Sequence, residues 1–105
     1  MSKEKEIKKI VNQIVEKYKP EKIILFGSFA HGRQTKDSDV DLFIIKSTNE
    51  PRTKRHLKVD RILLDRIMPL DILVYTPQEI KKRLSFGDFF IRNIIQQGKV
   101  LYGKK

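Results

Sequence analysis

The sequence predicts an α/β (α+β) fold in which helices cover a small β-sheet. Three short apolar runs have the length of strands, and segments with helical periodicity separate them along the 105 residues. The run at 23–26 is apolar without a break, which is typical of a strand buried on both faces at the centre of a sheet. A chain of this length is enough for one compact domain and too short for two, so we expect a single domain over residues 1–105.

The first half of the chain alternates helix and strand. Residues 3–18 are expected to form a helix that ends before Pro20, because a proline disfavours helix in the residue before it. A strand at Lys22–Phe26 follows. The helix is predicted from one apolar stripe at three- and four-residue spacing, which consists of Ile7, Ile10, Val11, Ile14, Val15 and Tyr18.

The segment after the first strand has the residues of a sharp turn. Gly27 allows the backbone to reverse, and Ser28 suits the start of a short helix that Gly32 would end. A polar loop then leads to a second strand, expected at Asp39–Lys46. Free backbone N–H groups and a hydroxyl at such a helix start are typical of a phosphate site.

A second helix is expected from Pro51 to about Arg66. Its apolar residues spread over most of the helix circumference, which indicates either a surface for a partner or a helix that its own domain buries well. These residues are Leu57, Val59, Ile62, Leu63, Leu64 and Ile67.

The last third of the chain is expected to hold a strand at Leu70–Tyr75 and two helices. Thr76 and Glu79 have the spacing of a capping box around a first helix that breaks at 85–87. Asp88 would cap the second helix, and 99–102 would add an edge strand. Phe90, Ile91, Ile94 and Ile95 are expected on the inward face of that helix, with Phe86 and Phe89 outside it.

Three carboxylates stand out on the predicted strands. Side chains alternate along a strand, so Asp39 and Asp41 are expected on the same face. Two adjacent carboxylates repel each other, and a divalent metal ion is the usual partner. Asp71 is a single acid in an apolar run, and because an unpaired buried carboxylate is costly, it is expected either to be exposed at the strand end or to bind something.

Each of these features has a plain alternative. A Gly-Ser pair is usually a turn, an Asp-x-Asp is often a solvated loop, and a buried aspartate can be held by a lysine or by backbone N–H groups. Their combination is more specific, because a Gly-Ser helix start, a carboxylate pair and a third carboxylate on the next strand together outline a nucleotide-handling site.

The residues Gly27-Ser28, then Gly32, then Ser38–Leu42 resemble the GSx10DxD signature of the minimal nucleotidyltransferases of the DNA polymerase β superfamily. The nearest resemblance is to the MNT-domain antitoxins that accompany HEPN-domain toxins. It extends from the first strand through Asp71 and the helix after it. The family signature often has arginine where this chain has His31. The resemblance implies a small mixed sheet flanked by helices, as in the polymerase β palm.

The resemblance also implies roles for the site residues. Gly27 and Ser28 would hold the phosphates of ATP, while Asp39, Asp41 and Asp71 would be the catalytic residues and would bind two Mg²⁺ ions. Asp71 would help to deprotonate the acceptor. In the toxin–antitoxin members, AMP is transferred to a tyrosine hydroxyl of the HEPN ribonuclease, which silences the toxin.

The alternatives are a non-catalytic antitoxin that acts by binding alone, a nucleic-acid-binding module, and a nucleotidyltransferase of small molecules. Little of the chain is left to grip a base or an acceptor, so a homo- or hetero-oligomer is expected, with the partner surface around 57–67 and 86–89. The formal net charge of +10 favours polyanionic partners, although solvated lysines would give the same excess.

Composition restricts the remaining possibilities. Hydrophobic residues make up 39% and charged residues 34%, which indicates a globular chain. Cysteine is absent, so disulfides and thiolate metal sites are excluded. No apolar run approaches the length of a membrane span and the N-terminal residues lack the apolar core of a signal peptide, so we expect a cytoplasmic protein.

Overall fold

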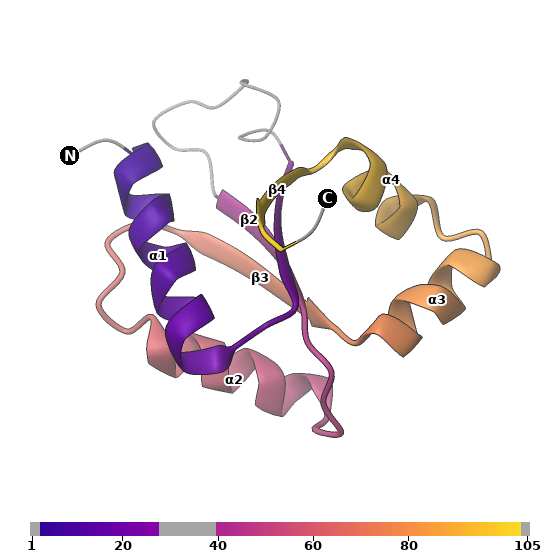
Figure 1. The fold of residues 1–105 in the computed structure, drawn as a ribbon, viewed down its shortest axis with the longest axis horizontal. Coiled ribbons are helices and arrows are strands. Elements are labelled where there is room, and N and C mark those ends of the chain that lie inside the picture. The colour runs from indigo at the N-terminus through magenta and orange to yellow at the C-terminus, as the bar shows by residue number, and fades with distance from the viewer. Residues whose placement is uncertain (1–2, 28–39, 104–105) are drawn as a thin grey trace.

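The computed structural model describes residues 3–27 and 40–103 of the chain. They form α1 (Lys3–Tyr18), β1 (Lys22–Phe26), β2 (Val40–Ile45), α2 (Arg52–Ile62), β3 (Leu70–Tyr75), α3 (Pro77–Ser85), α4 (Phe89–Gln97) and β4 (Lys99–Tyr102). The strands make one sheet in the order β3-β2-β1-β4 (Figure 1). β1 is antiparallel to β2 and β4, whereas β2 and β3 are parallel, so the expected mixed sheet with β1 at its centre is confirmed.

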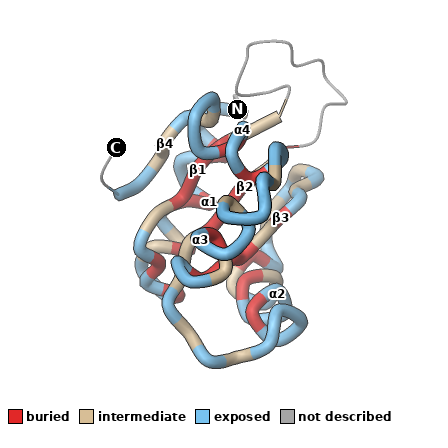
Figure 2. Tube along the Cα trace, turned by 90° about the vertical axis from the view of Figure 1, so that its right-hand side faces the viewer, coloured by how far each residue is buried: buried red, intermediate tan, exposed pale blue. Residues whose placement is uncertain are grey.

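Two pairs of helices cover the two faces of the sheet (Figure 1). Successive side chains of a strand point to opposite faces of the sheet, which explains why both faces are covered. On β2, Val40, Leu42 and Ile44 pack with α1 and α2 in one core cluster, while Phe43 packs with α3 and α4 in a second cluster. Figure 2 shows buried residues running along the strands and the inner sides of the helices. No helix within residues 3–27 and 40–103 has the length and apolar character needed to cross a bilayer.

Several sequence predictions need correction. The second helix ends at Ile62 rather than near Arg66, with Leu63 as its C-cap. Phe90 and Ile95 are 54% and 40% exposed and therefore lie at the edge of the inward face of α4 rather than in the core. The reason is geometric: α4 has only nine residues, and only Ile91 and Ile94 among them are buried. The second strand ends at Ile45, whereas the sequence predicted an end at Lys46.

The apolar residues of the second helix region divide between the core and the surface. Val59 and Leu63 are fully buried, whereas Leu57, Leu64 and Ile67 are 49%, 80% and 74% exposed. The interpretation that the domain itself buries the whole apolar arc is therefore wrong. The exposed members leave an apolar surface at the C-terminal end of α2 and in the connection to β3.

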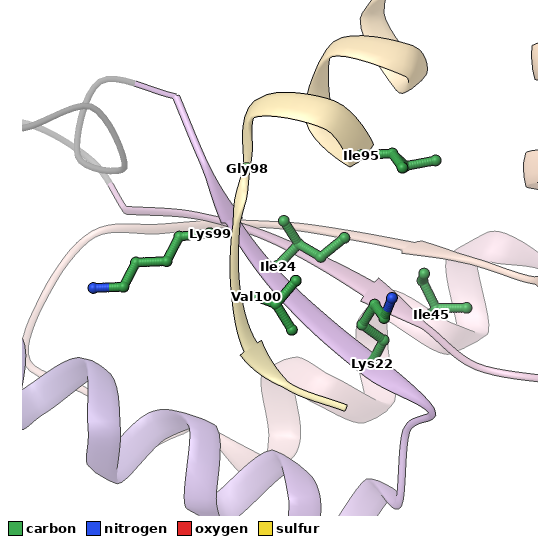
Figure 3. A pocket seen from close by; sticks show the side chains of 7 residues that line it. All are labelled: Lys22, Ile24, Ile45, Ile95, Gly98, Lys99 and Val100. Carbon is green, nitrogen blue, oxygen red and sulfur yellow. The ribbon is translucent and has the colours of Figure 1, made fainter. Parts of the chain in front are cut away.

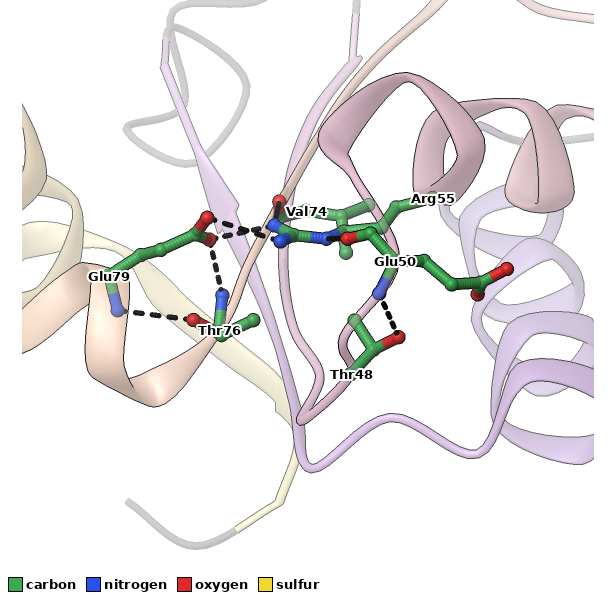
Figure 4. Close-up of polar contacts among 6 residues, drawn as sticks. All are labelled: Thr48, Glu50, Arg55, Val74, Thr76 and Glu79. Atoms are coloured by element: carbon green, nitrogen blue, oxygen red, sulfur yellow. Dashed lines mark hydrogen bonds and ion pairs between the residues drawn. The ribbon is translucent and has the colours of Figure 1, made fainter.

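A buried arginine joins α2 to the end of β3 and the start of α3 (Figure 4). Arg55 is 5% exposed, and its Nη1 and Nη2 donate to the two carboxylate oxygens of Glu79 at 2.7 and 3.1 Å. Its Nε donates to the carbonyl of Glu50 at 2.8 Å, and Nη1 also donates to the carbonyl of Val74 at 3.2 Å. Glu79 in turn accepts from the N–H of Thr76, which completes the predicted capping box.

This cluster should make stability depend on pH. The hydrogen bond from Arg55 is the main reason why the pKa of Glu79 falls from 4.5 to about 2. A lowered folded-state pKa means that the stabilisation is complete above the unfolded pKa near 4.5 and is lost as the pH falls toward 2. Arg55→Met should therefore remove most of this acid sensitivity and, by leaving Glu79 without its ion-pair partner, should cost roughly 2–4 kcal/mol at pH 7.

Urea unfolding of both proteins between pH 7 and pH 3 measures the effect. Lys58→Met is a matched control, because Lys58 also pairs with a glutamate, Glu50, at 2.8 Å but is 54% exposed. An exposed pair contributes about 0–1 kcal/mol, so this control should stay close to the unchanged protein. An acid-induced loss of stability that is the same with and without Arg55 would contradict the assignment.

Candidate active site

The pairing of β2 with β3 places two of the predicted carboxylates side by side. Asp41 and Asp71 are each the second residue of their strand, and the parallel register sets them directly opposite each other. Neighbouring strands are about 4.8 Å apart, and residues in register point to the same face. Because Phe43 and Tyr75 follow at even spacing and pack with α3 and α4, the carboxylates lie on that side of the sheet.

The turn after β1 passes directly beside one of these carboxylates. Gly27 follows Phe26, which is the residue of β1 opposite Asp41. Gly27 has φ of +79°, and a Cβ built on it would overlap with Oδ2 of Asp41. Glycine is therefore required at this position by its backbone conformation and by the space that the Asp41 carboxylate occupies.

The two carboxylates differ in their exposure. Asp41 is half-buried, whereas Asp71 is exposed at the start of an edge strand. The expectation that Asp71 is exposed at a strand end or binds something agrees with this position. Paired carboxylate oxygens that share one face suit a hard divalent cation such as Mg²⁺. Within the described ranges, no group of three or more histidines, cysteines and acids is placed to hold a metal.

Ser28, Gly32 and Asp39 lie outside the described residues, as do the short helix and the polar loop predicted between β1 and β2. Of the predicted site residues, Gly27, Asp41 and Asp71 are therefore the ones whose positions the structure gives. It brings these three together at one end of the sheet.

An aromatic cluster next to the carboxylates was missed by the sequence analysis. The ring of Phe26 packs edge to face against Phe43 and Phe90, with centroids 6.5 and 5.9 Å apart. Phe43 also stacks on Tyr75 at 5.2 Å. The period-2 alternation that places Asp41 also places Phe43 on its face, which could have predicted part of the cluster. The contact with Phe90 is tertiary and left no signal in the sequence.

A separate hollow of about 530 Å³ lies between the sheet and the end of α4 (Figure 3). It is lined by apolar side chains and two lysines and contains no carboxylate. Its chemistry therefore differs from that of the Asp41–Asp71 pair, and the candidate active site is an open position at strand ends rather than this hollow. The lining residues are Lys22, Ile24, Ile45, Ile95, Gly98, Lys99 and Val100.

Residues 5–102 match the family model described as the nucleotidyltransferase domain. The chain belongs to this family. Over 107 residues, the domain is 33% identical to "Putative protein adenylyltransferase MJ0604" of Methanocaldococcus jannaschii, with 97% of this chain and 100% of the relative covered. A second protein of that organism, "Putative protein adenylyltransferase MJ1379", is 34% identical over 80 residues, with 71% and 79% covered.

Solved structures agree with the nucleotidyltransferase fold. A structure described as a putative nucleotidyltransferase from Sulfolobus solfataricus has a TM-score of 0.68 at 20% identity and covers 95% of this chain and 79% of its own. A toxin–antitoxin with AMP-PNP has a TM-score of 0.62 at 23% identity, with 95% and 74% covered. A mutant of the toxin–antitoxin MntA-HpeT has a TM-score of 0.55 at 22% identity, with 92% and 73% covered. The domain is a nucleotidyltransferase enzyme by family, and these similarities show its fold.

Proposed function

We propose that this nucleotidyltransferase is a Mg²⁺-dependent protein adenylyltransferase that moves AMP from ATP to a protein hydroxyl. The observation that carries the proposal is the in-register pair Asp41 and Asp71 beside the turn at Gly27. The names of the curated relatives support a protein as the acceptor. AMP-PNP is an analogue of ATP, and its presence in a similar toxin–antitoxin structure supports ATP as the donor.

The roles of the residues follow from their chemistry. Gly27 and Ser28 would hold the triphosphate. Two Mg²⁺ ions would be held by Asp39, Asp41 and Asp71. The roles of Ser28 and Asp39 rest on the sequence motif alone. Bound Mg²⁺ would offset the negative charge of the phosphates. The half-buried Asp41 beside the turn suits metal and phosphate binding, while the exposed Asp71 can be reached by an incoming acceptor.

The proposed transfer is a displacement at the α-phosphorus of ATP. The hydroxyl oxygen of the acceptor bonds to this phosphorus, and the bond from the phosphorus to the oxygen that bridges to the β-phosphate breaks. Pyrophosphate leaves with the electron pair of that bond. Asp71 accepts the proton of the hydroxyl, which is the role of a general base.

We further propose that the acceptor is a tyrosine of a HEPN-domain ribonuclease toxin and that the chain is its antitoxin. The similar toxin–antitoxin structures support this pairing. Large exposed apolar side chains on two surfaces are suited to a protein partner: Leu64 and Ile67 are 80% and 74% exposed, and Phe86 and Phe89 are 75% and 78% exposed. These surfaces equally favour the second candidate, an antitoxin that neutralises its toxin by binding alone.

Transfer assays separate the two candidates. The domain is incubated with Mg²⁺ and a HEPN-domain ribonuclease as the candidate acceptor, using ATP labelled either at the α- or at the γ-phosphate. Label from the α-phosphate should appear on a tyrosine of the ribonuclease, while γ-label should not appear and EDTA should stop the transfer. Neutralisation of the ribonuclease without any label would make the binding antitoxin the correct reading.

The contact between Gly27 and Asp41 gives a matched pair of variants. Gly27→Ala should lose ATP binding by more than about tenfold, because the new Cβ displaces the Asp41 carboxylate in addition to straining a positive φ. Gly87→Ala has nearly the same φ, +77°, but its Cβ meets nothing within 4 Å, so it tests the strain without the clash. Calorimetric titration with ATP and Mg²⁺ measures the ATP affinity of both variants. Equal affinities would mean that Gly27 is only a turn residue.

A further inference from the structure

Phe90 lies at the border of the candidate active site although it is not a core residue. It is in the first turn of α4 and is 54% exposed. Its ring meets Phe26 edge to face at 5.9 Å with an interplanar angle of 85°. Phe26 stands next to Gly27 in the chain and opposite Asp41 in the sheet. An edge-to-face contact occupies at most one face of the Phe90 ring, and just over half of this residue's surface is exposed.

Polar groups stand beside this ring. An open groove of about 400 Å³ on α4 is lined by Phe89, Phe90, Arg92, Asn93 and Gln96. Asn93 is exposed and lies three residues after Phe90, so both side chains project from neighbouring positions on the same side of the helix. Within the described part of the chain, the amide of Asn93 makes no hydrogen bond, so its donor and acceptor are both available.

A flat aromatic face next to a free carboxamide is the chemistry that recognises a purine base. Bases stack on aromatic side chains, and an asparagine amide can pair with the N6 and N7 atoms of adenine through one donor and one acceptor. The position also fits ATP: with phosphates at Gly27 and Asp41, the base must lie one ribose away from the carboxylates. Phe90 is placed for this, because its ring contacts Phe26, the residue of β1 that is opposite Asp41.

We propose that Phe90 and Asn93 form the nucleobase subsite of the enzyme, with adenine stacked on the Phe90 ring and its N6–N7 edge on the Asn93 amide. This inference rests on the proposed function, because it requires ATP at the Asp41–Asp71 pair. It assigns base selection to α4 of this chain rather than to a second protein.

Binding of ATP and of inorganic tripolyphosphate, both with Mg²⁺, separates the base from the phosphates. The unchanged protein should bind ATP more tightly than tripolyphosphate. Phe90→Leu keeps an apolar contact for Phe26 but removes the stacking surface, so its Kd for ATP should rise roughly tenfold while its Kd for tripolyphosphate stays the same. Phe90→Trp should retain ATP binding. Phe86→Leu is the control, since Phe86 is 75% exposed but does not line the groove.

The preference of the protein for ATP over GTP tests the proposed role of the Asn93 amide. Asn93→Leu should reduce the preference for ATP over GTP several-fold without changing the Kd for tripolyphosphate. Three results would contradict the proposed subsite. In the first, Phe90→Leu binds ATP as tightly as the unchanged protein does. In the others, Asn93→Leu keeps the preference for ATP over GTP, or the unchanged protein binds tripolyphosphate as tightly as ATP. Absence of all binding by the unchanged protein would instead overturn the proposed function itself. Loss of toxin binding by Phe90→Leu with ATP binding intact would reassign Phe90 to a protein interface.

Discussion

Asp41→Asn is expected to abolish AMP transfer while leaving the metal-free protein at least as stable as before. The substitution keeps the size of the side chain and one acceptor oxygen, and it removes one of two charges that face each other across β2 and β3. Like charges on neighbouring strands repel each other, and salt screens this repulsion where the carboxylates are exposed. Loss of the charge relieves this repulsion and at the same time removes a metal ligand.

Thermal unfolding in EDTA, together with the transfer assay, measures both effects. Asp65→Asn is a matched control, because Asp65 contacts Lys9 and Gln13 of α1, on the other side of the sheet from the carboxylate pair. It should leave transfer unchanged. A clear fall in the melting temperature of metal-free Asp41→Asn would mean that the carboxylate is a structural acceptor within the fold, and the metal-binding role would then be wrong.

The elements that local rules control were predicted well from the sequence. The apolar stripe of α1, the capping box at Thr76 and the cap at Asp88 each involve residues within a few positions of one another. Interactions over such distances leave a regular pattern in the chain. The same applies to Asp71, whose isolation in an apolar run indicated an exposed or bound carboxylate.

Tertiary contacts were much harder to predict. Arg55 is one of several cations on α2, together with Arg52, Lys54 and Lys58, and only the proximity of Glu79 shows that it is the buried one. The exposure of Phe90 and Ile95 likewise depends on how α4 crosses the sheet. In the candidate site, adjacency of Asp41 and Asp71 depends on the parallel register of β2 and β3, which the spacing of the residues does not fix.

The two carboxylates of the pair occupy different surroundings, and this difference bears on their roles. Asp41 is half-buried beside the turn at Gly27, whereas Asp71 is exposed on an edge strand. A half-buried carboxylate beside the turn is suited to hold a metal against the phosphates. An exposed one is accessible to a hydroxyl carried by a separate protein, so substitutions at these two positions should affect binding and catalysis to different degrees.

Asp71→Asn should therefore lower ATP affinity only modestly and reduce the rate of transfer by about 10²–10⁴, the range expected when a general base is lost. The amide keeps the shape of the side chain but neither binds a metal ion as a charged ligand nor accepts a proton at neutral pH. An interaction made only in the transition state reduces kcat and kcat/KM together, and single-turnover kinetics at saturating ATP measure this directly.

The same variant separates the enzyme from the binding antitoxin. The exposed apolar surfaces at Leu64 and Ile67 and at Phe86 and Phe89 do not include Asp71, so the variant should still bind its toxin. It should then leave the toxin unmodified and active, and cells that express both should not grow. Mass spectrometry of the co-purified toxin, read beside cell survival, decides between the two. If Asp71→Asn protects cells while the toxin carries no AMP, neutralisation occurs by contact alone and the adenylyltransferase proposal is wrong.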